Sequence, residues 1–273
     1  MNSLCIDKNL QREVDEILPR CGHIKTAFAY ETVRSTNDCA HALEKVGAQS
    51  GTVVIANAQS EGRGRLRRSW QMLPGDIALS LIVRPPHVPH GVSLLPMMQA
   101  LAIVDALKSL GLAPRVKWPN DVIVPAPNGS HLSYFGGFRK IAGILVENIF
   151  TDHGVTASII GIGINIVPNG SLREQVPHAL SLRELRPPTT RGEVLRALLT
   201  ALDRRILACG VDGHDRALLS EYESMCETLG RQVCVEGGGS GQAIRLNDDG
   251  TLVVFDGLRE HTVYAGDIGL SGC

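Results

Sequence analysis

The chain has 273 residues, 44% of them hydrophobic, and a formal net charge of −1 at pH 7. This length fits one large domain, or a large domain followed by a small one, and the hydrophobic fraction is enough to bury a substantial core. The nearly neutral charge excludes a globally basic nucleic-acid-binding protein, so any basic patch must be local.

Cysteine usage and the N-terminal residues favour a soluble, cytoplasmic protein. The seven cysteines include no C-x-x-C pair, which argues against a disulfide framework or a zinc cluster. Charges interrupt the apolar residues within 1–20, so no signal peptide is predicted. The spacing of Leu10, Val14 and Ile17 favours an amphipathic helix there instead.

The elements expected next alternate between helices and strands. Residues 38–46 have a helical pattern that Ser35 or Thr36 could cap, and residues 51–58 and 77–83 are predicted strands. Residues 92–110 are predicted to form a long buried helix rather than a membrane span, because charges interrupt their apolar run. Further along we expect two short strands within 115–124 joined by a turn at 119–121, strands at 141–149 and 156–167, and helices at 191–209 and 214–226.

The composition changes after about Thr228, where short β-like runs alternate with turns. Several short strands at close spacing predict a small barrel or sheet. We therefore expect two domains, residues 1–227 and residues 228–273. The glycine-rich segment 236–241 is predicted to be a hairpin tip.

Segment 59–70, QSEGRGRLRRSW, is the first that could carry chemistry. It holds four arginines, whose planar guanidinium groups suit phosphate or carboxylate, and glycines that would let a ligand approach the backbone. Trp70 offers a flat face for stacking. Taken alone, the segment fits a solvated basic loop equally well, and a short basic run is also typical of a nucleic-acid patch.

Three further segments are each ambiguous alone. KWPND at 117–121 places a lysine before a tight turn, although Pro, Asn and Asp are ordinary turn residues. KIAGILVE at 140–147 brings a lysine into a buried strand, where a bound anion or a strand-end position would satisfy it. GIGINI at 161–166 has glycines that allow close approach, by a ligand or by a packed neighbour, but lacks the third glycine of a dinucleotide fingerprint.

Together these segments resemble biotin–protein ligases, also called holocarboxylase synthetases. The resemblance covers about residues 33–167. Its signatures are STN at 35–37, QSEGRGR at 59–65, KWPND at 117–121, KIAGILVE at 140–147 and GIGINI at 161–166. Their order makes coincidence improbable. The fold implied is α+β, a mixed sheet with flanking helices similar to class II aminoacyl-tRNA synthetases, followed by a small SH3-like β-barrel.

The resemblance also implies roles for individual residues. The implied catalytic residues are Lys140, Arg65 and Asp121, with Asp121 near the incoming acceptor lysine. The implied biotin-binding residues are Ser35, Thr36, Asn37, Gln59, Arg63, Gly64, Arg65, Lys140 and Gly143. The implied ATP-binding residues are Arg65, Arg68, Trp70, Lys117, Asn120, Lys140 and Asn165.

The reaction implied is ATP-dependent. Biotin's carboxylate would attack the α-phosphate of MgATP to give biotinyl-AMP, and a lysine of a biotin carboxyl carrier domain of a carboxylase would then displace AMP. Arginine and lysine would stabilise the phosphate charge, and a closing loop would exclude water. Mg²⁺ is expected only with ATP. His87 and His90 share a loop without a third ligand, so no protein metal site is predicted.

Two residues and one segment depart from the family pattern. Glu61 stands where the family has a small residue, and Arg67 where it has a glycine, so Glu61 could pair with a neighbouring arginine and Arg67 restricts the backbone. Residues 125–139 are longer than the family's usual turn and are expected to form a surface insertion.

Other readings remain open from sequence alone. Only about thirty residues precede Ser35, too few for the winged helix-turn-helix of repressor relatives, so no DNA binding is expected. Some relatives dimerise, and a homodimer stays an open alternative. The nearest rival enzyme is a lipoate–protein ligase, and the rival from another class is a non-catalytic biotin-binding regulator.

Overall fold

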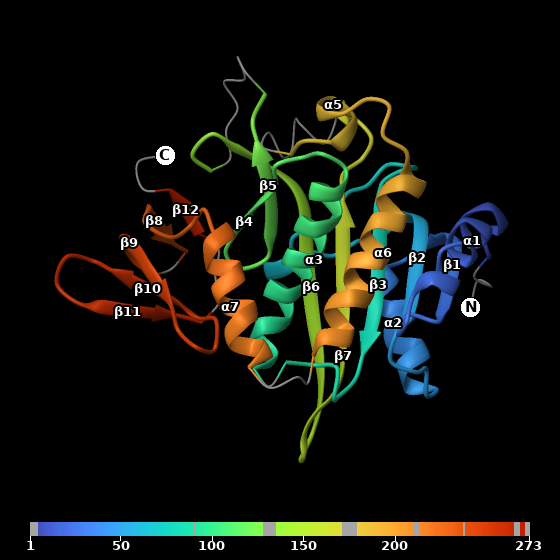
Figure 1. The fold of residues 1–273 in the computed structure, drawn as a ribbon, viewed down its shortest axis with the longest axis horizontal. Helices are drawn as coiled ribbons and strands as arrows, with labels where there is room; N and C mark the ends of the chain where they lie inside the picture. The colour runs from blue at the N-terminus through green and yellow to red at the C-terminus, as the bar shows by residue number, and fades with distance from the viewer. Residues whose placement is uncertain are drawn as a thin grey trace.

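The computed structural model describes residues 5–89, 91–127, 135–170, 179–209, 213–236, 238–264 and 268–270. Two sheets organise these residues (Figure 1): a seven-stranded sheet with the order β1-β2-β3-β7-β6-β5-β4, and a five-stranded sheet with the order β11-β10-β9-β8-β12. His90, Gly237 and residues 128–134 of the expected insertion lie outside the described residues.

The large sheet comes from the first two-thirds of the chain and the small sheet from its end. The strands of the large sheet are β1 (Thr26–Val33), β2 (Thr52–Gln59), β3 (Ile77–Val83), β4 (Arg115–Lys117), β5 (Asp121–Pro125), β6 (Phe138–Thr151) and β7 (Gly154–Ile164). Those of the small sheet are β8 (Gln232–Val235), β9 (Gly239–Leu246), β10 (Leu252–Phe255), β11 (Glu260–Val263) and β12 (Ile268–Leu270).

The helices vary widely in length. They are α1 (Lys8–Asp15), α2 (Thr36–Lys45), α3 (Leu95–Ser109), α5 (Leu182–Leu185), α6 (Arg191–Ala208) and α7 (His214–Met225). Three short 3-10 turns accompany them: η1 (Leu18–Arg20), η2 (Arg65–Arg67) and η3 (Val92–Leu94). Within the described part of the chain, no helix has both the length and the apolar character that crossing a bilayer requires.

The large sheet is mixed, as expected. Strands β1 and β2 run parallel, and every other pair of neighbours in this sheet is antiparallel. A parallel pair needs a crossover connection, which α2 supplies between β1 and β2. The α+β class predicted from the sequence is therefore confirmed.

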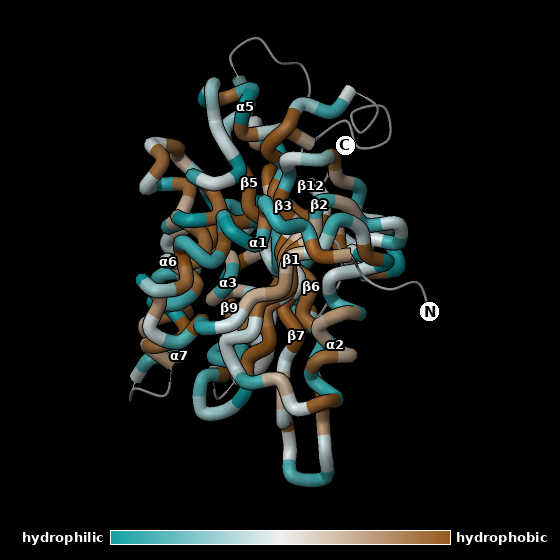
Figure 2. Tube along the Cα trace, turned by 90° about the vertical axis from the view of Figure 1, so that its right-hand side faces the viewer, coloured by the Kyte–Doolittle hydropathy of each residue, from teal (hydrophilic) through white to brown (hydrophobic). Residues whose placement is uncertain are grey.

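Both faces of the large sheet are covered near its centre (Figures 1 and 2). Side chains alternate along β2: Val53 and Ile55 join the main core with α3 and α6, whereas Val54 and Ala56 join a smaller cluster with Ala40 of α2. A strand buried on both faces has no polar side, which explains the continuous apolar run at 53–56.

The small sheet packs against the large one through buried contacts. Trp118, 2% exposed, donates from Nε1 to the carbonyl oxygen of Gly250 at 3.0 Å, and its backbone N–H donates to Oγ1 of Thr228 at 3.0 Å. A Cβ placed on Gly250 would lie 2.7 Å from Cε of Met97 in α3. The five described strands are joined antiparallel, with β11 and β12 at the edges.

Most elements agree with the sequence-based predictions, and the differences are local. The strand at Thr26–Val33 was not predicted, because Glu31 and Thr32 break its apolar run. The long helix begins at Leu95 after a 3-10 turn, with Pro96 in its first turn. Ser35 occupies the N-cap position of α2 but its side chain makes no capping hydrogen bond.

Candidate active site

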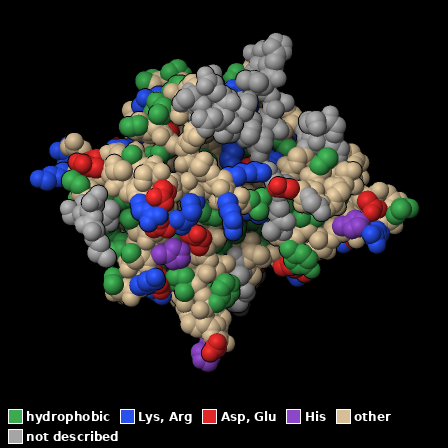
Figure 3. Space-filling view, turned by 180° about the vertical axis from the view of Figure 1, so that it is seen from behind, with side chains coloured by type: hydrophobic (Ala, Val, Ile, Leu, Met, Phe, Trp, Pro, Cys, Tyr) green, Lys and Arg blue, Asp and Glu red, His purple; other side chains and the backbone are tan. Residues whose placement is uncertain are grey.

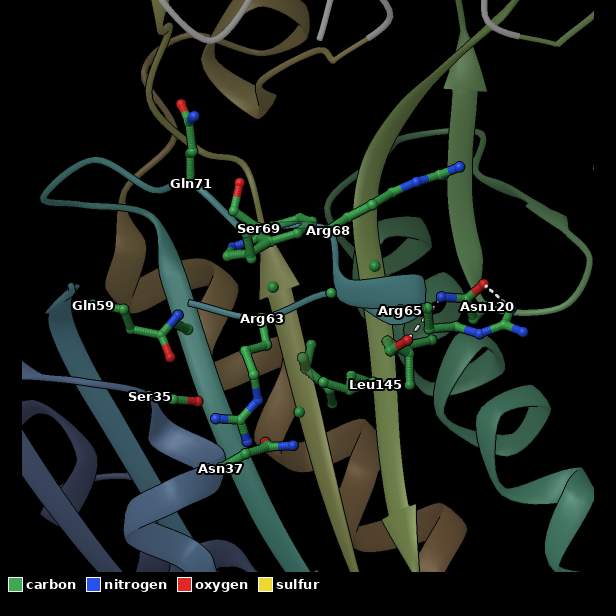
Figure 4. A pocket seen from close by; sticks show the side chains of 18 of the residues that line it. Ser35, Asn37, Gln59, Arg63, Arg65, Arg68, Ser69, Gln71, Asn120 and Leu145 are labelled. Carbon is green, nitrogen blue, oxygen red and sulfur yellow. Dashed lines mark hydrogen bonds between the residues drawn. The ribbon is translucent and has the colours of Figure 1, made fainter. Parts of the chain in front are cut away.

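One cavity of about 630 Å³ lies across the middle of the large sheet (Figure 4). Its walls come from the start of α2, the end of β2, the loop that follows β2, the β4–β5 turn, and the adjacent strands β6 and β7. It is lined by Ser35, Thr36, Asn37, Gln59, Arg63, Gly64, Arg65, Leu66, Arg68, Ser69, Trp70, Gln71, Ala78, Asn120, Asp121, Lys140, Gly143, Ile144, Leu145, Gly161, Ile162, Gly163, Asn165 and Ala179. Every candidate site residue except Lys117 is among them.

One end of the cavity is a buried hydrogen-bond network. Ser35, Thr36 and Asn37 are each less than 5% exposed. Oε1 of Gln59 accepts from the backbone N–H of Thr36 at 2.8 Å. The hydroxyl of Ser80 lies 2.8 Å from Oγ1 of Thr36 and 2.6 Å from Oδ1 of Asn37. Because the network offers both donors and acceptors, this end suits a ligand head group with both.

Glycines in β6 and β7 make room for side chains of the site. A Cβ on Gly163 would overlap the indole of Trp70, and one on Gly161 would lie 2.6 Å from Oδ1 of Asn37. A Cβ on Gly143 would lie 3.2 Å from both Cζ3 of Trp70 and Nζ of Lys140. The close approach expected at these glycines is therefore made by the chain's own side chains.

Residues 60–71, here called the arginine loop, fold back on themselves over the cavity. Trp70 donates its backbone N–H to the carbonyl of Gly62 at 2.8 Å, and Gly64 donates to the carbonyl of Arg68 at 2.7 Å. Two arginines join the loop to opposite sides of the site, and Figure 4 shows them pointing apart. Arg65 donates from Nη1 to Oδ1 of Asn120 at 2.9 Å, whereas Arg63 points toward the start of α2.

The Arg63 guanidinium is held by two carboxylates. Nη1 donates to Oδ1 of Asp38 at 2.6 Å, and Nη2 lies 3.4 Å from both oxygens of Glu147. Partial burial by itself would lower the pKa of Arg63, but the hydrogen bond that it donates to Asp38 and the charge of Glu147 raise this pKa above its usual value. Arg63 is therefore tied to α2 and β6.

Lys140 lies at the centre of the site. Its Nζ is 2.7 Å from Oδ1 of Asp121 and 5.9 Å from the ring centroid of Trp70. The Asp121 side chain is only 8% exposed, and that of Lys140 21%. A buried carboxylate with a cation beside it satisfies both charges until an anionic ligand competes for the cation.

The chain is similar to known proteins of one ligase family. The family model for the biotin/lipoate A/B protein ligase family matches residues 29–165. A biotin–[acetyl-CoA-carboxylase] ligase of Mycobacterium tuberculosis is 32% identical over 246 residues, covering 86% of this chain and 85% of the relative. The chain belongs to the biotin/lipoate A/B protein ligase family.

Other relatives cover similar lengths. The bifunctional ligase/repressor BirA of Bacillus subtilis is 29% identical, over 88% of this chain and 73% of that protein. The solved structure of the Aquifex aeolicus biotin protein ligase in complex with biotin and ATP has a TM-score of 0.72, at 24% identity, and covers 90% of this chain and 98% of that one. That likeness shows that the two share a fold, and the resemblance stated from sequence is confirmed.

In this member of the ligase family, Lys117 lies outside the lining of the cavity. It is 2% exposed, it does not line the cavity, and its ammonium lies 5.6 Å from the ring centroid of Phe135. Successive residues of a strand point to opposite faces, so a lysine beside the turn need not face the same side as Asn120 and Asp121. The contact of Lys117 with the nucleotide stays a prediction, for which the cavity lining gives no support.

The two departures from the family pattern have structural counterparts. Glu61 pairs with Arg34 at the end of β1, with Nη2 and Oε2 2.6 Å apart, rather than with an arginine of its own loop. Leu66 and Arg67 both adopt positive φ, 53° and 60°. Because only glycine adopts this conformation without strain, the glycine usual in the family at position 67 fits the backbone observed here.

Sequence reasoning missed several residues of the site. Ser80 is the one polar residue in the apolar run of β3, which was a usable signal. Asp38 and Glu147 stand inside or beside the quoted motifs but received no role. Ala179 lines the cavity from beyond β7, and nothing local to it in the sequence indicated this. Among the described residues, no group of three or more His, Cys, Asp or Glu is placed to hold a metal ion.

Proposed function

We propose that this chain is an ATP-dependent biotin–protein ligase that forms biotinyl-5′-AMP and transfers biotin to a lysine of a carboxylase's biotin carboxyl carrier domain. The observation that carries the proposal is the meeting of Lys140, Arg65 and a buried polar end in one cavity. The curated names of its relatives in Mycobacterium tuberculosis and Paracoccus denitrificans, both biotin–[acetyl-CoA-carboxylase] ligases, support it.

The biotin subsite is the polar end of the cavity. Ser35, Thr36, Asn37 and Gln59 supply donors and acceptors for the ureido ring of biotin, which itself donates and accepts. The apolar strand residues Ile144 and Ile162 line the path of the aliphatic chain. Biotin's carboxylate then reaches the centre of the cavity, beside Lys140 and the backbone of Gly64.

The nucleotide subsite is the opposite side of the cavity. Trp70 gives an aromatic face for the adenine, while the amides of Asn120 and Asn165 are suited to its polar edge. Arg65 and Arg68 are close enough to the cavity to bind phosphate oxygens. ATP enters as its Mg²⁺ complex, so the metal ion arrives with the substrate.

The first step joins biotin to AMP. A biotin carboxylate oxygen attacks the α-phosphorus, the bond from that phosphorus to the bridging oxygen breaks, and pyrophosphate leaves with the electron pair. Lys140 sits where it can bind the carboxylate and an α-phosphate oxygen, which offsets the repulsion between the two anions. Its bond with Asp121 is exchanged for these ligands.

The second step transfers biotin to protein. The acceptor lysine first gives a proton from its ammonium group to water. Its neutral amine then attacks the acyl carbon, the anhydride C–O bond breaks, AMP leaves with the electron pair, and the nitrogen releases a second proton to water as the amide forms. When Lys140 turns to the ligand, the negative charge of Asp121 attracts the acceptor's ammonium group toward the anhydride. The arginine loop excludes water, which would otherwise hydrolyse the anhydride.

The catalytic unit in this proposal is residues 1–227, and residues 228–273 form a second domain that supports it. Partners follow from the reaction: a carboxyl carrier domain that presents a lysine. The contacts of Trp118 with Thr228 and Gly250 support a second domain fixed against the KWPND turn.

The proposal is tested by mixing the protein with MgATP, a biotin carrier domain, and labelled biotin or labelled lipoate. We expect label from biotin on the carrier lysine, and pyrophosphate release that requires biotin. Lys140→Ala should slow adenylate formation by about tenfold or more, because it removes the cation between two anions. Transfer of lipoate in place of biotin would overturn the substrate, and a wild-type rate in Lys140→Ala would remove Lys140 from the site.

A further inference from the structure

Arg63 and Arg65 join the arginine loop to separate parts of the site. On one side Arg65 bonds Asn120 in the β4–β5 turn. On the other side Arg63 bonds Asp38 in α2 and approaches Glu147 in β6. The second attachment crosses the entrance of the polar end, and Figure 4 shows Arg63 spanning the space between the loop and Asn37.

Glu147 links this attachment to the polar end itself. Its Oε2 accepts from Nδ2 of Asn37 at 2.7 Å and lies 3.2 Å from Nε2 of His41. The other side of the Asn37 amide faces Ser80. One carboxylate therefore fixes the head-group network and the loop at the same time, although neither Glu147 nor Asp38 lines the cavity.

We propose that Asp38 and Glu147 are positioning residues that act through Arg63 as a latch, holding the arginine loop closed over the bound adenylate. The proposal rests on the proposed function, because the adenylate is its product. The latch sets how long the adenylate stays bound and protected from water. Lys140 and Arg65, by contrast, act on the reacting groups.

The exposure of the three side chains suits a latch that opens. They are 39% exposed for Arg63, 40% for Asp38 and 32% for Glu147. Water screens such pairs, so each one shifts an opening equilibrium by a factor of about 1.5 to 5. A fully buried ion pair at this point would hold the loop shut against release of AMP and entry of the acceptor. In the view from behind, basic and acidic side chains intermingle at the middle of this face (Figure 3).

The first measurement needs no catalysis. The chain has two tryptophans, Trp70 in the arginine loop and Trp118, which is 2% exposed. Acrylamide quenching of the free protein therefore reports how often the loop exposes Trp70. We expect stronger quenching in Asp38→Asn and Glu147→Gln, which remove charge and keep size. The control Glu13→Gln removes a carboxylate whose side chain is 32% exposed, as that of Glu147 is, from an ion pair with Arg191 outside the arginine loop, and should quench as wild type does.

The second measurement is the rate at which preformed biotinyl-AMP leaves the enzyme. We expect it to rise about 1.5- to 5-fold in each variant, and more in the double variant. If the latch acts through Arg63, Asp38→Asn will have no further effect in an Arg63→Gln background. If Asp38 had a merely structural role, the effects of Asp38→Asn and Arg63→Gln on the release rate would add.

The outcomes separate the two proposals. The latch would be overturned if Asp38→Asn and Glu147→Gln both showed wild-type quenching and wild-type release of the adenylate. It would also be overturned if Asp38→Asn raised the release rate as much in the Arg63→Gln background as in the wild type. Failure of the wild-type protein to form biotinyl-AMP would overturn the proposed function, and the quenching result would then still decide whether these carboxylates hold the loop.

Discussion

Trp70 and Gly163 show how one residue without a side chain shapes this site. The indole rests on the bare backbone of β7, where any Cβ would overlap it, and Lys140 lies beside the same ring. The glycine of the GIGINI motif therefore sets where the arginine loop can come to rest. Its effect is steric and acts through Trp70.

Gly163→Ala should displace Trp70 and slow adenylation. The added methyl group takes the place of the indole, so the loop closes in a shifted position, and a misplacement of about 1 Å can cost up to about a hundredfold in rate. We expect a loss of at least about tenfold in kcat/KM, measured by biotin-dependent pyrophosphate release. Gly269→Ala is the matched control, because a Cβ there meets nothing within 4 Å. Normal adenylation in Gly163→Ala would show that the position of the Trp70 indole over Gly163 does not matter for the reaction.

At the scale of secondary-structure elements, a cluster of charged side chains joins helices α3, α6 and α7. Arg205 of α6 pairs with Asp105 of α3 at 2.7 Å and with Glu221 of α7 at 2.6 Å. The hydrogen bond from Arg205 holds the pKa of Glu221 below its usual value of 4.5. The ionised form is thus favoured by folding, which makes the stability of this helical layer dependent on pH.

The sign of this dependence follows from proton linkage. Because the folded-state pKa of Glu221 is depressed, its contribution is fully present above pH 4.5 and is lost as pH falls through the folded value. Glu221→Gln should lower the free energy of unfolding at pH 7 by about 0.5–1 kcal/mol, a value already reduced for solvent screening. Denaturant unfolding at pH 7 and pH 4 measures it, and the difference between variant and wild type should shrink at the lower pH.

Glu223→Gln provides the comparison on the same helix, since within the described residues Glu223 makes no ion pair. It should leave the unfolding free energy nearly unchanged at both values of pH. If both substitutions lowered the free energy of unfolding equally, the charge of the helix in general, and not the pair with Arg205, would account for the loss of stability.

At the scale of the whole molecule, the KWPND turn is where the two sheets meet. The Trp118 indole donates to the carbonyl of Gly250, and Gly250 packs against Met97. Asn120 and Asp121, two and three residues after Trp118, line the cavity. Docking of the small sheet therefore stabilises the turn that carries these site residues.

Trp118→Phe should destabilise this docking. It leaves the Gly250 carbonyl buried without its donor, which costs about 1–3 kcal/mol. We expect a lower unfolding midpoint and faster proteolysis between the two sheets, together with weaker ATP binding through the disturbed turn. Tyr264→Phe, at a side chain 78% exposed in the same small sheet region, should change none of these. A stable Trp118→Phe protein with normal proteolysis would place the attachment elsewhere.

The sequence by itself determined which segments meet in the site. Motif residues such as Ser35, Arg65, Lys140 and Asn165 all line one cavity. Each segment alone was ambiguous, and it was their order and their resemblance to biotin–protein ligases that predicted a common site. Continuous apolar runs likewise located β2 and β3 correctly.

Only the tertiary structure decided how those residues are paired. Arg63 and Glu147 are 84 residues apart, and Arg65 and Asn120 are 55 apart. Their meeting depends on sheet order and register, which no local pattern encodes. The same holds for Lys117: a motif gives a residue's place along the strand, but it does not give the buried neighbour, Phe135, that its side chain meets.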